Sequence, residues 1–134
     1  MAECCGSAVK LIYSCSGAAD VGEIADRVTR KLRDDGYARM TCLAGIGAGL
    51  SGYIESAKGA DTVITIDGCA HACARKSLQR IGVEPVSYIL TKMGLVKGET
   101  PVSEKVVAVM SERIKDAKYA PVDSQQTGER GSSC

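Results

Sequence analysis

Residues Thr62–Cys73, with the sequence TVITIDGCAHAC, are the stretch that decides the fold. The first five residues form a continuous run of β-branched side chains, which is typical of a strand buried on both faces of a parallel sheet. A helix is predicted directly after it, over residues 70–80, and Gly82 ends that helix. A buried strand followed at once by a helix is the repeating unit of an α/β fold.

The same unit recurs on both sides of this segment. The alternation of apolar runs predicts further strands over residues 8–14, 37–42 and 85–90. Helices are predicted from Asp20 to Gly36, with Asp20 and Glu23 as a capping box, then over residues 50–57, and from Thr100-Pro101 to Ala117. A glycine-rich loop is expected between residues 42 and 50. Together these elements predict a doubly wound, mostly parallel sheet of about four strands with a three-layer, Rossmann-like architecture.

Length and composition fit one domain. The chain has 134 residues, a net charge of +1 and 45% apolar residues. We expect an N-terminal segment over residues 1–7, a single α/β domain over 8–118 and a polar disordered tail over 119–134. The near-zero charge excludes the electrostatic footprint of a nucleic-acid-binding protein. No apolar stretch is long enough to span a membrane, and no basic segment marks a signal peptide, so we expect a cytoplasmic protein.

Seven cysteines, in a chain without Phe or Trp, are the unusual feature of the composition. Cys15, Cys42 and Cys69 are separated by 27 residues and then by 27 again, and each lies at the carboxyl end of a predicted strand. Those ends open onto one edge of a parallel sheet. Cys73 follows Cys69 by four residues, a spacing that puts two side chains on the same face of a helix. Four thiols at one edge predict a tetrahedral metal site, with Zn²⁺ as the expected ion and an Fe–S cluster as the alternative.

Other interpretations of these residues remain open. Each cysteine could instead be an ordinary buried core residue. Cys4 and Cys5 precede the first strand and Cys134 ends the polar tail, so none of the three is a predicted ligand. His71 could be a ligand, but its position between two ligands predicts a surface side chain. Four thiolates around zinc form a closed site, which is typical of structural zinc. A chain of this length can fold without a stabilising metal, so a sensing or metal-handling role also has weight.

Three blocks of the sequence carry a family resemblance. YSCSGAADVGEIADRVTRKL, MTCLAGIGAGLSGYIESAKGAD and VITIDGCAHACARKSL resemble successive parts of the DGC-domain family, whose name describes the motif Asp67-Gly68-Cys69. The resemblance covers residues 8–117 and implies a small zinc-binding protein with four chelating cysteines. Mapped by motif, these are Cys15, Cys42, Cys69 and Cys73. The resemblance supplies no reaction.

Two further motifs indicate other chemistry. Gly47, Gly49 and Gly52 match the dinucleotide pattern GxGxxG, with Asp67 at the distance of a ribose ligand, but the glycines begin several residues beyond the strand and predict a loop instead. Cys69 and Arg75 have the Cys-x5-Arg spacing of oxyanion-binding loops. A thiol-dependent redox or oxyanion enzyme that uses this pair, with phosphate or arsenate as its substrate, is therefore the alternative function. We expect Asp67 to accept hydrogen bonds from loop N–H groups.

Overall fold

The computed structural model describes residues 8–116. Within this range lies an all-parallel sheet with the strand order β2-β1-β3-β4. The strands are β1 (Lys10–Ser14), β2 (Arg39–Met40), β3 (Thr62–Asp67) and β4 (Val86–Ile89). The predicted parallel α/β sheet is therefore confirmed, and each strand starts within its predicted range.

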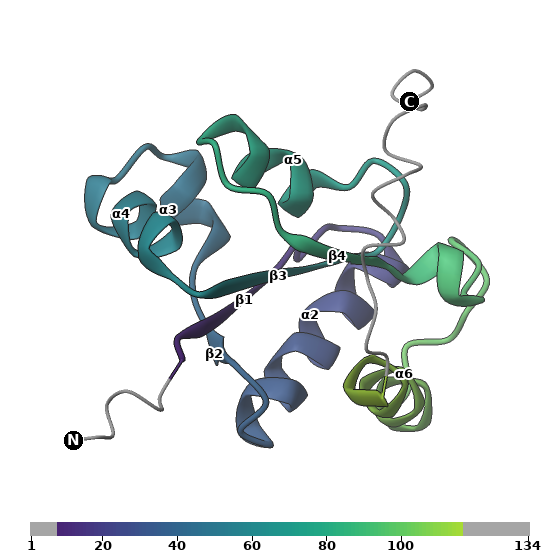
Figure 1. The fold of residues 1–134 in the computed structure, drawn as a ribbon. Coiled ribbons are helices and arrows are strands. Elements are labelled where there is room, and N and C mark those ends of the chain that lie inside the picture. Colours follow the sequence, from purple (N-terminus) through teal and green to yellow (C-terminus); the bar gives the residue numbers. More distant parts are fainter. Residues whose placement is uncertain (1–7, 117–134) are drawn as a thin grey trace.

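Helices cover both faces of this sheet (Figure 1). On one face lie α2 (Asp20–Asp34) and α6 (Glu104–Asp116), and on the other lie α3 (Leu43–Gly47), α4 (Ser51–Gly59) and α5 (Cys73–Arg80). A 3-10 segment, η1 (Leu90–Met93), follows β4. The three layers are those predicted for a doubly wound fold.

The order of the strands determines where a ligand site can form. The chain runs from β1 to β2 on one side and then returns past β1 to β3 on the other. The carboxyl ends of β1 and β3 therefore flank the point where the winding reverses, which is where open α/β sheets bind their ligands. Cys15 comes directly after β1, and Cys69 comes two residues after β3.

Two apolar clusters form the core, and alternate residues of each strand supply them. Ile12 and Ile66 face α2 and α6, whereas Leu11, Tyr13 and Val63 face α3, α4 and α5. Both clusters are built mainly of aliphatic side chains. The first also contains Tyr88 and Met110, with a partly buried Cys15 packed against it, and the second contains Tyr13.

Two helices next to cysteines differ from the prediction. The expected glycine-rich loop after Cys42 contains the short helix α3, which packs Ile46 into the core. Helix α5 begins at Cys73 rather than at Ala70, because Ala72 has a left-handed backbone with φ of 49° that interrupts the helix before it. Cys69 therefore lies in a loop and does not share the helix of Cys73.

The helix start at Asp20 is confirmed, whereas the capping box predicted there and the helix start at Pro101 are corrected. The residue that caps α2 is Ala19, and the carboxylate of Asp20 accepts hydrogen bonds from Val21 N–H at 2.7 Å and from Gly98 N–H at 2.9 Å. Asp20 therefore joins the start of α2 to the loop at Gly98 instead of forming a capping box. Helix α6 begins at Glu104, after the Thr100-Pro101 pair.

Several predictions concern residues outside the described range. These are the N-terminal segment 1–7, the polar tail 119–134, the end of the last helix at Ala117, and Cys4, Cys5 and Cys134. Among residues 8–116, no helix is long and apolar enough to cross a membrane.

Candidate metal centre

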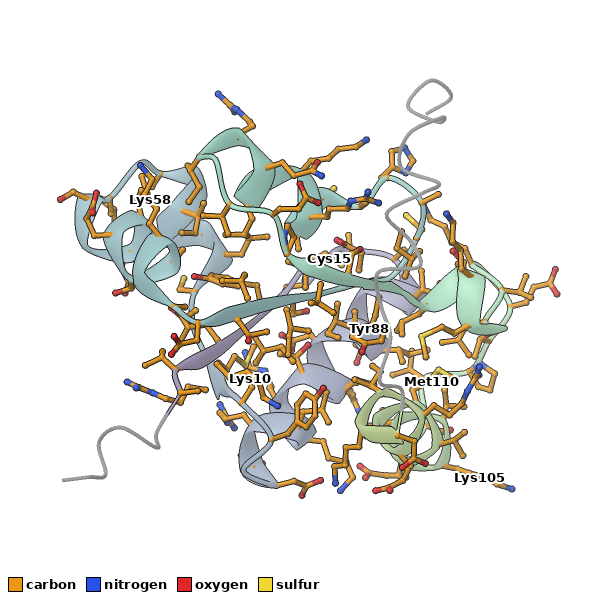
Figure 2. All side chains as sticks on the ribbon, viewed as in Figure 1. Lys10, Cys15, Lys58, Tyr88, Lys105 and Met110 are labelled. Atoms are coloured by element: carbon orange, nitrogen blue, oxygen red, sulfur yellow. The ribbon has the colours of Figure 1, made fainter. Side chains whose placement is uncertain are left out.

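Cys15 is held through both its backbone and its thiol. Its backbone N–H donates to Ile66 C=O at 3.1 Å, so the pairing of β1 with β3 extends one residue beyond the strand. Its half-buried Sγ accepts a hydrogen bond from Gly68 N–H at 3.4 Å. Burial raises the pKa of the Cys15 thiol, while the amides of Gly68 and Gly17 act in the opposite direction. Figure 2 shows Cys15 between the two helical layers.

Cys42 lies at the end of the neighbouring strand. The N–H of Thr41 donates to Ile12 C=O at 3.1 Å, and Cys42 itself keeps an extended backbone before α3 begins. Its side chain is exposed. The thiol is therefore held by a regular backbone and is open to solvent.

Cys69 has neighbours of a different kind. Its half-buried Sγ lies 3.5 Å from Nδ1 of His71 and 3.7 Å from Nζ of Lys97. His71 is exposed, as predicted for a surface side chain, and its ring nevertheless contacts a predicted ligand. Lys97 is a contact that sequence reasoning missed, since it lies 28 residues further along the chain and nothing in its local sequence marks it.

The buried carboxylate of Asp67 fixes the start of α5. It accepts hydrogen bonds from Ala74 N–H at 2.7 Å and from Arg75 N–H at 3.1 Å. Burial raises the pKa of Asp67, and these two donors together with the charges of Arg75 and Lys76 oppose that effect. The prediction that Asp67 accepts from N–H groups is confirmed, although the donors belong to the first turn of the helix. Asp67 thereby positions Cys73, the first residue of α5.

Two glycines allow the backbone segments around the cysteines to touch. A Cβ atom on Gly68 would lie 2.6 Å from the carbonyl of Val21, and one on Gly22 would lie 2.7 Å from the carbonyl of Gly17. The start of α2 therefore packs directly on the loops that carry Cys15 and Cys69. Sequence analysis missed this role of Gly22, although a glycine inside an apolar helical pattern often marks such a close approach.

The four thiols share one edge of the sheet but do not form a closed set. Cys15 and Cys42 line the same cavity, and Cys73 is near enough to Cys15 to raise the pKa of its thiol. Cys69 instead lies against His71 and Lys97. Among residues 8–116, no three side chains of His, Cys, Asp or Glu are close enough together to hold a metal ion. The donor types suit zinc, whereas their present spacing is not that of a bound tetrahedral site.

The cavity between these elements has a volume of about 860 Å³. Its lining residues include Cys15, Cys42, Arg30 and Tyr53. Serine and threonine residues also line it, namely Ser14, Ser16, Thr41 and Ser77. Two of the four predicted ligands therefore border the same cavity.

The remaining motifs do not form the sites that their spacing suggested. Gly47 ends α3, so a helix separates the glycine-rich segment from β2, and the tight strand-to-helix turn of a dinucleotide site is not formed there. In the loop from Cys69 to Arg75, the N–H groups of Ala72, Ala74 and Arg75 already donate to acceptors within the protein. The structure therefore disfavours an oxyanion-binding loop, which needs such amides free.

A parallel α/β domain with four cysteines along one sheet edge is the class of protein that the fold and this site define. The family model of the DGC domain matches residues 11–114, and the chain belongs to that family. The chain is also similar to the anaerobic and virulence modulator AnvM of Pseudomonas aeruginosa. The two are 31% identical over 88 residues, which are 65% of this chain and 67% of that protein. No solved structure matches the chain.

Proposed function

We propose that this protein takes up and releases zinc through Cys15, Cys42, Cys69 and Cys73, and that it senses or handles the metal. The observation that carries the proposal is the common position of the four thiols at the carboxyl edge of the sheet, around the point where the winding reverses. The cationic side chains nearby would offset part of the net charge of −2 that four thiolates give a zinc ion. Of these, Lys97 contacts Cys69.

The arrangement favours an exchangeable site over a structural one. Of the four cysteines only Cys15 packs against the core of the described residues, and the side chains of Cys42 and Cys73 are exposed. Coordination by all four cysteines requires Cys69 to leave its contacts with His71 and Lys97. We therefore expect zinc binding to be coupled to a movement of the loop after β3, and the metal-free protein to stay folded.

The family relationship supports a regulatory role. AnvM carries the word modulator in its name, and this chain is similar to it over two thirds of its length. A cytoplasmic location belongs to the same proposal, because free thiols persist in a reducing compartment. In this account the partner of the site is the metal ion itself.

Metal-free protein tests this function. Zinc titrated against a competing chelator is expected to bind at one ion per chain, without colour. The circular dichroism spectrum and the cooperative unfolding of the metal-free protein are expected to remain those of a folded domain. Unfolding on chelation would show a structural site, a brown protein would show an Fe–S cluster, and failure to take up zinc would refute the proposal.

A further inference from the structure

The loop after β3 holds two donors that suit zinc within one turn of the chain. Ala72 N–H donates to Cys69 C=O at 3.0 Å, which closes a turn over residues 69–72. Within this turn, Nδ1 of His71 lies 3.5 Å from Sγ of Cys69. The left-handed backbone of Ala72 separates the turn from α5. The backbone that connects Cys69 and His71 therefore keeps their side chains together.

The distance between these two atoms is that of two ligands of one zinc ion. Zn–S bonds are about 2.3 Å long and Zn–N bonds are about 2.0–2.1 Å long. At a tetrahedral angle, bonds of these lengths put the sulfur and the nitrogen roughly 3.5 Å apart. The contact in the structure has the same length, so the pair needs no rearrangement to coordinate a metal ion.

The set of four thiols, in contrast, has to be assembled. Among residues 8–116, no three side chains of His, Cys, Asp or Glu are close enough together to hold a metal ion. Coordination by all four cysteines therefore requires a movement of Cys69, whereas the pair with His71 is already in place. His71 is exposed and Cys69 is half-buried, so an ion in solution can reach both. Lys97, which contacts the same sulfur, is exposed and can turn away through its long side chain.

We propose that Cys69 and His71 form a two-donor zinc site that receives the ion before the four thiols come together. His71 is thus a zinc ligand in addition to the four cysteines. This inference rests on the proposed function, because it names the residues through which the metal enters the cysteine edge. Binding to the pair releases the thiol proton of Cys69 to solvent, since a thiolate is the form that coordinates zinc.

The pair can be observed directly because the chain contains a single histidine. Imidazole ring signals in an NMR spectrum of the full chain therefore belong to His71. In a variant with every cysteine except Cys69 replaced by serine, zinc at constant pH is expected to shift these signals in a saturable manner. The control variant also carries Cys69→Ser. Loss of an outer partner of a zinc ligand costs roughly 10–100-fold in affinity, so loss of one of two donors is expected to weaken binding at least as much.

The rate of zinc uptake is a second measurement, which does not depend on the folding of that variant. His71→Ala is introduced into the chain that keeps all four cysteines of the sheet edge, and uptake is followed by stopped flow with a zinc indicator. We expect uptake to be several-fold slower than in the wild type, with the same zinc content at equilibrium. Gln79→Ala removes an exposed side chain of α5 that contacts Glu84, and this control is expected to take up zinc at the wild-type rate.

Two results would overturn the inference. One is a set of His71 signals that zinc does not shift, or shifts equally without Cys69, and the other is uptake at the wild-type rate by His71→Ala protein. Either result in a chain whose four thiols bind one zinc refutes the inference alone. Zinc binding by the pair, in a protein whose zinc affinity does not depend on Cys15 or Cys42, refutes the proposed function alone.

Discussion

Replacing Gly68 by alanine tests the close packing that supports the cysteine edge. The new Cβ atom would lie 2.6 Å from the carbonyl carbon and oxygen of Val21 and 2.8 Å from the backbone nitrogen of Gly22. Carbon atoms in contact are normally about 3.5–4.0 Å apart. The atoms that would clash belong to the backbone and cannot rotate away, so the loop after β3 and the start of α2 must separate.

The size of the effect follows from this overlap. Overpacking that forces a backbone shift costs about 1–3 kcal/mol of unfolding free energy. For a domain of this length each kcal/mol lowers Tm by about 4 °C, so we expect Gly68→Ala to lower Tm by roughly 4–12 °C. The same shift lengthens the 3.4 Å contact from Gly68 N–H to Cys15 Sγ, so the affinity for zinc is expected to fall as well.

Thermal unfolding of the metal-free protein is the assay, and Gly52→Ala is the matched control. Gly52 lies in α4, and a Cβ atom there would meet nothing within 4 Å. Alanine in a helix is favoured over glycine by about 0.5–1 kcal/mol, so the control is expected to be as stable as the wild type or more stable. A Gly68→Ala protein with wild-type Tm and zinc affinity would refute the packing argument.

Two further substitutions test the neighbouring structure. Asp67→Ala leaves the N–H groups of Ala74 and Arg75 without their acceptor, and we expect urea unfolding to show a loss of about 1–3 kcal/mol. Asp35 has a lowered pKa, chiefly through its hydrogen bond with Lys115 on α6. Its contribution to stability is therefore present above its unfolded pKa of about 3.9 and is lost as the pH falls through the lowered value. Asp35→Asn is expected to lower Tm at pH 6, and this difference is expected to vanish in acid.

Each of these substitutions has a matched control. Asp67→Asn keeps one acceptor oxygen and is expected to lose less stability than Asp67→Ala, and equal losses would contradict the role of the hydrogen bonds. Asp34→Asn removes an exposed carboxylate that pairs with the adjacent Arg33. Its Tm is expected to stay near that of the wild type, and an equal effect of Asp34→Asn and Asp35→Asn would contradict the specific role of Lys115.

The strands were predictable because burial on both faces demands continuous apolar runs. The run Thr62–Ile66 gave β3, and the spacing of Cys15, Cys42 and Cys69 indicated one sheet edge. The sequence also predicted that the carboxylate of Asp67 accepts hydrogen bonds from backbone N–H groups. These features depend on local sequence and on the rules of α/β topology.

The detailed arrangement of the thiols was not predictable, because contacts between distant segments determine it. Ser16, directly after Cys15, and Ala72, directly before Cys73, both have positive φ angles of 48° and 49°. Nothing in the local sequence favours that backbone for either residue type. The contact of Lys97 with Cys69 likewise arises only when the loop after η1 folds back over the sheet edge. The sequence motif therefore predicts four donors, but it does not predict their present separation.

Zinc content of single cysteine variants tests the central claim most directly. The background is the full chain with Cys4, Cys5 and Cys134 replaced by serine, which leaves only the four cysteines of the sheet edge. Elemental analysis of this protein after zinc loading and dialysis is expected to give one zinc per chain. The single Ser variants of Cys15, Cys42, Cys69 and Cys73 are each expected to lose most of that zinc. After chelation of the metal, each variant is expected to unfold at the same temperature as the metal-free background protein. Full retention of zinc by the Cys42→Ser variant would contradict the account, because only the fold brings that thiol to the other three.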